Sequence, residues 1–207
     1  MNKQSFITIL LTVLMSMIGP KAFAHDIEVV NSDGVTIYYR WANDAKDELQ
    51  VSFRGSDYYS YNEYSGDVVI PESVVYEGKV LSVTSIGYDT FRECVNLTSV
   101  TIPTSVSRIY EYAFAECSGL TCLVVNSDLV YVGYGVFFRS FNLKKVTFNC
   151  EKINLIINGI QSVSEVSMTD KVTSICDNAF KNCSSLTTVN IPNSVTSIGN
   201  NAFENCI

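Results

Sequence analysis

Apolar residues recur along this chain with a period close to 23 residues. The stretch VTSIGYDTFRECVNLTSVTIPTS at residues 83–105 returns almost intact at residues 172–194 as VTSICDNAFKNCSSLTTVNIPNS. When both copies are aligned with the sequence around them, phenylalanines fall into one column with spacings of 23, 23, 43 and 23 residues. The interval of 43 residues contains one complete period and one shortened copy of 20. The members of this phenylalanine column are Phe91, Phe114, Phe137, Phe180 and Phe203.

Three further apolar columns keep the same register. A period of roughly 20–29 residues with the pattern L-x-x-V-x-I is typical of a leucine-rich-repeat solenoid, in which each coil contributes one short strand. Because a single coil cannot bury its own apolar side, we expect the coils to stack around one continuous core. The three columns are Leu97, Leu120, Leu143, Val163 and Leu186; Val100, Leu123, Val146, Val166 and Val189; and Ile102, Val125, Phe148, Met168 and Ile191.

Local signals divide each complete copy into a turn and a strand. The run DNAFKNC at residues 177–183 begins with helix-capping residues and spaces Phe180 and Cys183 by three, which predicts one short helical turn per copy. The run LTTVNI at residues 186–191 alternates as a strand does. Pro192 ends that strand because proline has no amide donor for a ladder.

The fourth copy, roughly residues 149–170, departs from the pattern. It is short, and it carries Ile157 and Ile160 where phenylalanine and cysteine stand in the other copies. Its strand, residues 163–168, still fits the apolar columns. We therefore expect a regular strand in this copy together with a local kink or an irregular turn.

Residues 1–24 have the features of a secretory signal peptide. Lys3 precedes an apolar run at residues 6–18, and Ala22-Phe23-Ala24 forms a small-residue cleavage site. That run is too short to span a hydrocarbon core about 30 Å thick, and no later segment reaches the roughly 20 apolar residues that spanning requires. We expect an exported protein, secreted or at the cell surface, with no transmembrane segment in the mature chain.

Residues 25–66 follow a different pattern from the repeats. Two alternating β-rich runs, IEVV and VTIYYRW, flank the Asp33-Gly34 pair, which is a strong hairpin signal, and LQVSF follows at residues 49–53. Since a solenoid has an open apolar end wherever stacking stops, we expect residues 25–66 to form an N-terminal antiparallel β cap. Residues 67–207 then form the repeat array, whose last copy is incomplete.

The charge of the chain disfavours nucleic acid as a partner. The sequence has 14 basic and 21 acidic side chains, and removal of Lys3 and Lys21 leaves 12 basic ones and a formal net charge of −9. A polyanion needs a basic stripe for counterion release, yet Lys144-Lys145 is the only adjacent basic pair in the mature sequence.

Four of the seven cysteines follow the repeat rather than a disulfide framework. Each lies three residues after a column phenylalanine, which favours a ladder of buried thiols that make weak bonds to backbone carbonyls. Because neighbouring strands lie about 4.8 Å apart, close to the Cα separation that a disulfide tolerates, bridges between adjacent copies remain an alternative. The pairs in question are Cys94 with Cys117 and Cys183 with Cys206.

The units VTSIGYDTFRECVNLTSVTIPTS and VTSICDNAFKNCSSLTTVNIPNSVTSIGNNAFENC resemble the BspA-like leucine-rich repeats of bacterial surface proteins. The signature AFxNCxxLTxVxIPxSVTxIG carries this resemblance, which covers residues 68–207. It implies a right-handed repeat solenoid, export, and an adhesion or recognition surface for host matrix proteins, glycans or other microbes. The family shares no catalytic residues, so the resemblance implies no catalytic site and no cofactor.

The residues themselves offer little chemistry. The single histidine, His25, lies at the predicted mature terminus, a poor place for a general base. Cys122, Cys150 and Cys176 occupy three different repeat positions, which argues against a shared metal site. We expect a protein that is not an enzyme and binds no metal or cofactor, although counting acids does not dismiss a carboxylate pair.

Tyrosines mark the best candidate for a recognition surface. All twelve lie between Tyr38 and Tyr134, and five of them fall beside the turn glycine of the first three complete coils. Tyrosine provides a large amphipathic contact area, although a coat of tyrosines on an extracellular β surface is the alternative. The candidate residues are Tyr88, Tyr110, Tyr112, Tyr131 and Tyr134.

The outward face of the strands is a second candidate surface, with small, mixed and mostly uncharged side chains. At the end of the sequence, the array stops at Cys206-Ile207 before the strand of its sixth copy. We expect an extracellular protein or glycan as the ligand, with self-association through this uncapped end, or a fragment of a larger adhesin, as alternatives. The two outward rows are Ser99, Cys122, Lys145, Glu165 and Thr188, and Thr101, Val124, Thr147, Ser167 and Asn190.

Overall fold

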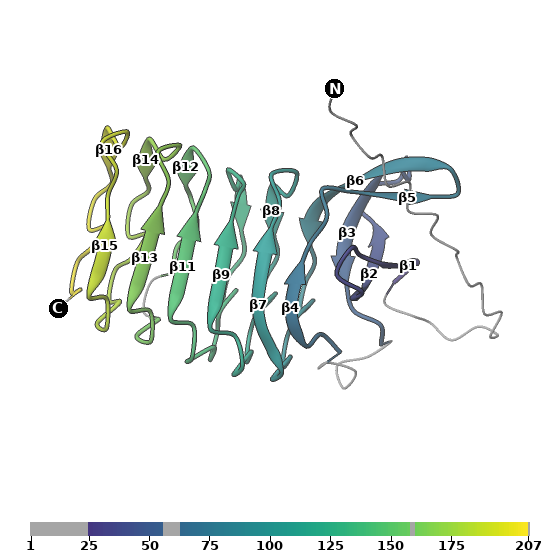
Figure 1. Cartoon of the computed structure of the whole chain (residues 1–207), viewed down its shortest axis with the longest axis horizontal. Helices are drawn as coiled ribbons and strands as arrows, with labels where there is room; N and C mark the ends of the chain where they lie inside the picture. The colour runs from purple at the N-terminus through teal and green to yellow at the C-terminus, as the bar shows by residue number, and fades with distance from the viewer. Residues whose placement is uncertain (1–24, 56–62, 158–159, 207) are drawn as a thin grey trace, which may run out of the picture.

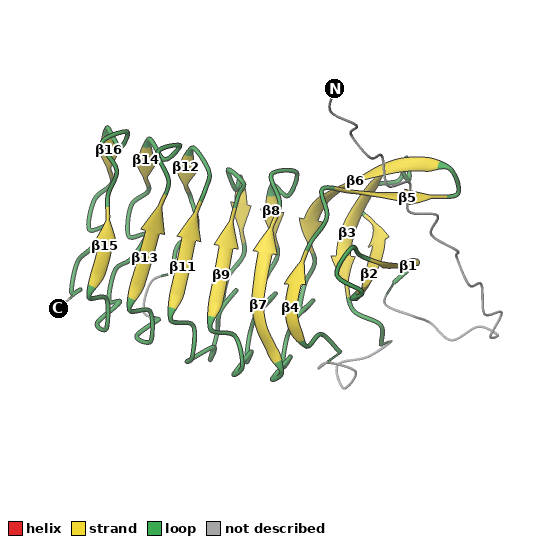
Figure 2. Ribbon diagram, in the orientation of Figure 1, coloured by secondary structure: helices red, strands yellow, loops and turns green. Residues whose placement is uncertain are grey.

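The computed structural model describes residues 25–55, 63–157 and 160–206. Within these ranges the chain forms sixteen strands and no helix, and Figure 2 accordingly shows strands joined by turns alone. The coils are stacked side by side along the long axis of the molecule (Figure 1). The expected signal peptide, residues 1–24, lies outside the described ranges.

The first sheet is a parallel ladder with one strand per coil, in the order β15-β13-β11-β9-β7-β4. Its register places each apolar column in one line, so that Val100 pairs with Leu123, then Val146, Val166 and Val189. The stacked coils predicted from the period are confirmed, including the regular strand of the fourth copy. The strands are β4 (Gly66–Val69), β7 (Leu97–Ile102), β9 (Cys122–Val125), β11 (Lys145–Phe148), β13 (Glu165–Met168) and β15 (Thr188–Asn190).

The second side of the solenoid is divided into two sheets at the fourth copy. One sheet runs through β6, β8 and β10, and a separate sheet contains β12, β14 and β16, so β10 and β12 do not pair. This break confirms the irregularity that the short copy predicts. The strands are β6 (Lys79–Ile86), β8 (Arg108–Ile109), β10 (Tyr131–Val132), β12 (Lys152–Ile153), β14 (Ser174–Ile175) and β16 (Ser197–Ile198).

The N-terminal strands extend the first of these two sheets. The strands β1 (Ile27–Val30), β2 (Thr36–Trp41) and β3 (Glu48–Ser52) pair antiparallel, as expected from the Asp-Gly turn. The strand β3 then pairs parallel with β6, so the meander is continuous with the solenoid. The strand β5 (Ser73–Tyr76) forms an antiparallel hairpin with β6 beside it.

The phenylalanine column forms a stack of rings inside the coils. The Phe91 and Phe114 rings lie 4.9 Å apart and almost parallel, and the Phe114 and Phe137 rings lie 5.4 Å apart. Phe180 and Phe203 continue the stack beyond the fourth copy with a centroid distance of 5.1 Å. Fully buried Tyr64 continues the stack at its N-terminal end, with its ring 4.7 Å from that of Phe91.

The cysteine ladder takes the thiol form. No disulfide joins any of the seven cysteines, all of which the structure describes. From the second complete coil onward, the residue three positions after each column phenylalanine donates to a carbonyl of the preceding coil. Ser140 takes this role where the third coil has no cysteine, so a hydroxyl and a thiol serve the same purpose. The contacts are Cys117 Sγ to Phe91 O at 2.8 Å, Ser140 Oγ to Phe114 O at 2.6 Å, Cys183 Sγ to Ile157 O at 3.4 Å and Cys206 Sγ to Phe180 O at 3.0 Å.

The predicted helical turn is wrong, because each turn contains two residues with positive φ. They lie two positions before and two positions after every column phenylalanine, as Asn178 at 57° and Asn182 at 59° do around Phe180. A right-handed helix requires φ near −63°, so these residues interrupt it. The N–H groups of the turn point to the next coil instead, and Phe180 N donates to Ala202 O at 2.8 Å.

Replacing Phe114 with alanine should lower the free energy of unfolding by about 3–5 kcal/mol, because it removes a fully buried ring from the middle of the stack. Urea unfolding of the purified chain measures this loss. Phe141→Ala is the matched control, since its side chain is 73% exposed and should change the free energy by no more than about 0.5 kcal/mol. Equal losses in both variants would contradict the buried stack.

Asn178→Val should destabilise the chain by about 1–2 kcal/mol relative to Asn178→Gly, because a side chain branched at Cβ is strained at positive φ. Thermal and urea unfolding of the two variants measures the difference. The same midpoint for both variants would show that the turn does not hold residue 178 in the left-handed region.

Candidate functional site

The five candidate tyrosines form two groups on the first three coils. Tyr88 stacks on Tyr110 with ring centroids 4.9 Å apart, and Tyr110 lies 5.6 Å from Tyr131. Tyr112 and Tyr134 form a separate edge-on pair at 5.9 Å. The structure thus brings together tyrosines from successive coils, as the repeat predicts, but in two clusters instead of one.

The tyrosines differ in how much they offer to a partner. Tyr88, Tyr131 and Tyr134 are exposed at 55%, 40% and 76%, respectively. Tyr110 and Tyr112 are half-buried, and the guanidinium of Arg92 lies over the Tyr112 ring at 5.9 Å. Tyr110 and Tyr112 therefore support the other rings, whereas the exposed three supply the contact area.

One carboxylate organises the first cluster. Tyr131 Oη donates to Glu111 Oε1 at 2.7 Å, and this hydrogen bond raises the pKa of Tyr131 to about 12 and lowers that of Glu111. The charge of Glu111 also raises the pKa of Tyr88. The raised pKa values keep the phenols of Tyr88 and Tyr131 neutral beside the Glu111 carboxylate at physiological pH.

The outward face of the first sheet is built as the sequence predicts. Both rows of outward residues pair in register from β7 to β15. Lys145 Nζ lies 2.6 Å from Glu165 Oε1, and Asp67 accepts hydrogen bonds from Thr98 and Ser99. Lys145 and Glu165 thus pair with each other and Asp67 is held by two hydroxyl groups, which leaves a face of mostly small, uncharged side chains.

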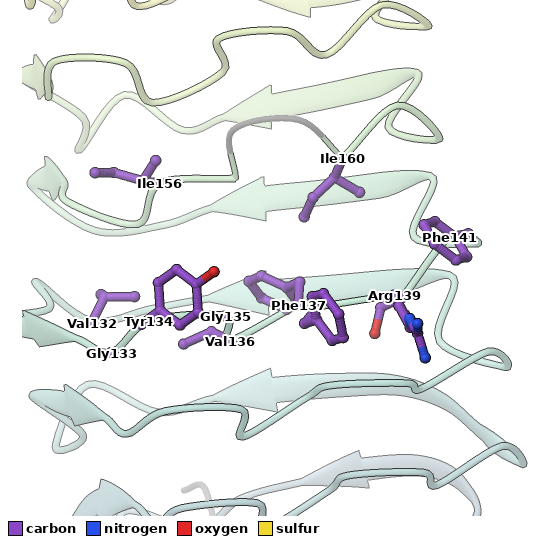
Figure 3. Close-up of a pocket in the computed structure, with 12 residues that line it drawn as sticks. Val132, Gly133, Tyr134, Gly135, Val136, Phe137, Arg139, Phe141, Ile156 and Ile160 are labelled. Atoms are coloured by element: carbon purple, nitrogen blue, oxygen red, sulfur yellow. The ribbon is translucent and has the colours of Figure 1, made fainter.

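A cleft lies between the third and fourth coils, and sequence reasoning missed it. It has a volume of about 570 Å³, and Figure 3 shows Tyr134, Phe137 and Arg139 on one coil opposite Ile156 and Ile160 on the next. The lining is largely aromatic and aliphatic. The signal in the sequence was the shortened fourth copy, which was interpreted as a kink rather than as an opening.

The described residues include no candidate metal cluster. No group of three or more histidine, cysteine, aspartate or glutamate side chains is close enough there to hold a metal ion. His25 Nδ1 lies 3.2 Å from the Arg54 carbonyl, and its ring packs 4.9 Å from that of Tyr38, where burial lowers its pKa. The described part of the chain also contains no helix with the length and apolar character needed to cross a membrane.

Comparison with known families identifies the repeat. Residues 158–207 match the family model described as BspA type leucine rich repeat region (6 copies). The match confirms the resemblance carried by the repeat signature, and residues 158–207 are similar to BspA type leucine-rich repeats. No functionally curated protein matches the chain at a significant level.

Three solved structures are similar to this chain, and one of them shows its architecture. A leucine-rich repeat protein from Eubacterium ventriosum has a TM-score of 0.53 and 21% identity, over 87% of this chain and 50% of its own length, which shows the leucine-rich-repeat fold. A leucine rich cell surface protein from Faecalibacterium prausnitzii has a TM-score of 0.47 and 23% identity, over 87% of this chain and 52% of its own. The pneumococcal vaccine antigen PcpA has a TM-score of 0.49 and 17% identity, over 88% and 48%. This chain spans about half the length of each of these three proteins.

Glu111→Gln should lower the pKa of Tyr131 from about 12 towards its ordinary value of 10.0, because the variant removes the carboxylate that accepts a hydrogen bond from the phenol. The raised pKa means that the contact is present below pH 10 and is lost as the pH rises through the folded value. Absorbance titration of phenolate checks this, and subtracting the curve of a Tyr131→Phe variant isolates the one tyrosine. A titration that Glu111→Gln leaves unchanged would contradict the hydrogen bond.

Proposed function

We propose that this chain, whose C-terminal part is similar to BspA type leucine-rich repeats, is a non-enzymatic recognition or adhesion protein. It binds an extracellular protein or glycan through the tyrosine surface of its first three coils, which we define as Tyr88, Tyr110, Tyr112, Tyr131 and Tyr134. The observation that carries the proposal is the pair of tyrosine clusters, which leave the ring of Tyr88 exposed on the first complete coil and those of Tyr131 and Tyr134 exposed on the third.

The chemistry of this surface suits a polar, uncharged ligand face. Phenol rings provide stacking area for sugar rings or apolar side chains, and their hydroxyl groups donate or accept hydrogen bonds at the edge. Glu111 adds a carboxylate, which accepts a hydrogen bond from Tyr131. The acidic balance of the chain makes nucleic acid a poor ligand.

The proposed placement of the protein is outside the cell. Residues 1–24 serve as a signal peptide, residues 25–66 as an N-terminal β-rich cap, and residues 67–207 as the repeat array. The continuity of β3 with β6 and the packing of Tyr64 on Phe91 support the capping role, because both cover the first coil. The protein is thus secreted or displayed at the surface and requires no cofactor.

Self-association as a structural spacer is the second candidate function. Such a spacer would have no other ligand, and its assembly would depend on protein concentration.

A Tyr88→Ser, Tyr131→Ser, Tyr134→Ser variant should lose most of its ligand binding, because the exposed contact area of both clusters disappears. The measurement is saturation binding of the mature protein to a glycan array and a panel of extracellular matrix proteins. The free energy of unfolding should stay within roughly 0.5 kcal/mol per site, since the three rings are exposed.

The matched control is a Val75→Ser, Val80→Ser variant, which changes two exposed apolar residues of the β5–β6 hairpin and should bind normally. Unchanged binding by the tyrosine variant would reject the tyrosine surface. Light scattering of the same samples tests the spacer, for which concentration-dependent assembly without saturable ligand binding is the expected result.

A further inference from the structure

The third coil presents a row of backbone donors that meet no acceptor among the described residues. In the complete coils, the column phenylalanine and the two residues with positive φ around it donate their N–H groups to the next coil, as Phe114 does to Val136 O at 2.8 Å. In the third coil the corresponding groups belong to Gly135, Phe137 and Arg139. They donate no hydrogen bond to any residue that the structure describes.

The cause is the length of the fourth copy. Ile157 lies nine positions after Phe148, whereas Phe137 lies twelve positions after Val125 at the same place in the preceding copy. The shorter segment follows a tighter path, and its strand β12 does not pair with β10. In the first sheet, β11 of the third coil still pairs with β13 of the fourth coil. The two coils are therefore joined along the first sheet and separated where β10 and β12 do not pair.

The opening is lined by exposed apolar side chains. Tyr134, Phe138, Phe141 and Ile156 are exposed at 76%, 46%, 73% and 49%, and they surround the cleft of about 570 Å³ seen in Figure 3. The guanidinium of Arg139 lies 5.1 Å from the Phe138 ring at the same rim. A contiguous group of large exposed apolar residues is unusual on a soluble surface and marks a contact site.

We propose that this cleft, the coil-gap site, binds an extended polypeptide segment of a partner protein. Carbonyl oxygens of the segment accept hydrogen bonds from the N–H groups of Gly135, Phe137 and Arg139. A large apolar side chain of the segment packs against Tyr134 and Phe141, and an acidic residue of the partner meets Arg139.

The molecule itself indicates why the occupant is a polypeptide. Around Phe91 the same donor row is met by carbonyls of alternate residues, Glu111, Ala113 and Ala115, at 3.2, 2.8 and 2.9 Å. An extended chain repeats its carbonyls on one edge at every second residue, and addition of a strand to an open edge is a general mode of peptide recognition. Sugar hydroxyl groups do not repeat at this spacing, so the coil-gap site favours peptide over glycan.

The test begins with a displayed library of linear peptides selected on the full chain. Affinities of the recovered peptides are then measured for the wild type and for a variant in which residues 149–156 are replaced by the eleven residues 169–179 of the next copy, TDKVTSICDNA. This replacement restores the 23-residue period and closes the gap. It should weaken peptide binding by about tenfold or more, the effect of losing a central apolar contact together with its hydrogen bonds, without lowering thermal stability.

A smaller change keeps the test decisive if the replacement does not fold. Phe141→Ser should also weaken binding of the peptides by roughly tenfold, whereas Val80→Ser, a control of nearly equal exposure at 71%, should leave it unchanged. Bound peptide should slow hydrogen exchange at the amides of Gly135, Phe137 and Arg139.

The coil-gap site is overturned if the library yields no binding peptide, if the closed variant or Phe141→Ser binds the peptides as well as the wild type does, or if exchange slows elsewhere only. The coil-gap site shares Tyr134 with the tyrosine surface, so the two sites are separated by a Tyr88→Ser, Tyr131→Ser variant that keeps Tyr134. That variant should bind the peptides normally, so rejection of the tyrosine surface and rejection of the coil-gap site are distinct results.

Discussion

Each coil of this solenoid is stabilised mainly by the next coil, and one aromatic ring per coil provides the central contact. The ring of Phe114 lies between those of Phe91 and Phe137 and is completely buried. Burial of such a ring contributes roughly 2–3 kcal/mol, which no isolated coil of 23 residues obtains on its own. The backbone follows the same rule, because the strands and the turns both donate their N–H groups to a neighbouring coil.

This dependence explains why a change of length matters more than a change of residue type. Ser140 replaces cysteine in the third coil and still bonds to the Phe114 carbonyl, and Ile157 replaces phenylalanine in the fourth coil and is still buried. Loss of three residues before Ile157, in contrast, separates β10 from β12 and leaves the cleft. The repeat accepts chemical substitution at its columns but not a shorter path between them, since donors and acceptors then no longer meet.

The sequence was sufficient to predict the features of the fold that depend on the repeat period. Columns that recur at a fixed interval must face the same direction, so the strands, their register and the line of rings followed from counting residues. The turn was mispredicted because asparagine is favoured both at the N-terminus of a helix and in the left-handed region. The positions of Asn178 and Asn182 around Phe180 were interpreted as a helical turn, whereas both residues have positive φ. Tyr64 was missed because it precedes the first complete copy and carries no repeat signature, although its ring continues the stack.

The candidate sites lie where the repeat is least regular, and the physics of a solenoid accounts for this. Identical coils satisfy one another completely, so a regular stretch such as the first sheet presents paired charges like Lys145 and Glu165 and little else. Contact area for a partner arises where variable positions carry large side chains, as Tyr88 and Tyr131 do, or where a coil fails to satisfy its neighbour. The second case is the stronger argument for binding. Exposed tyrosines are compatible with solvent. The N–H groups of Gly135, Phe137 and Arg139 bond to no described residue and lie beside an apolar cleft, so a polypeptide whose carbonyl groups match their spacing would gain both hydrogen bonds and apolar contact there.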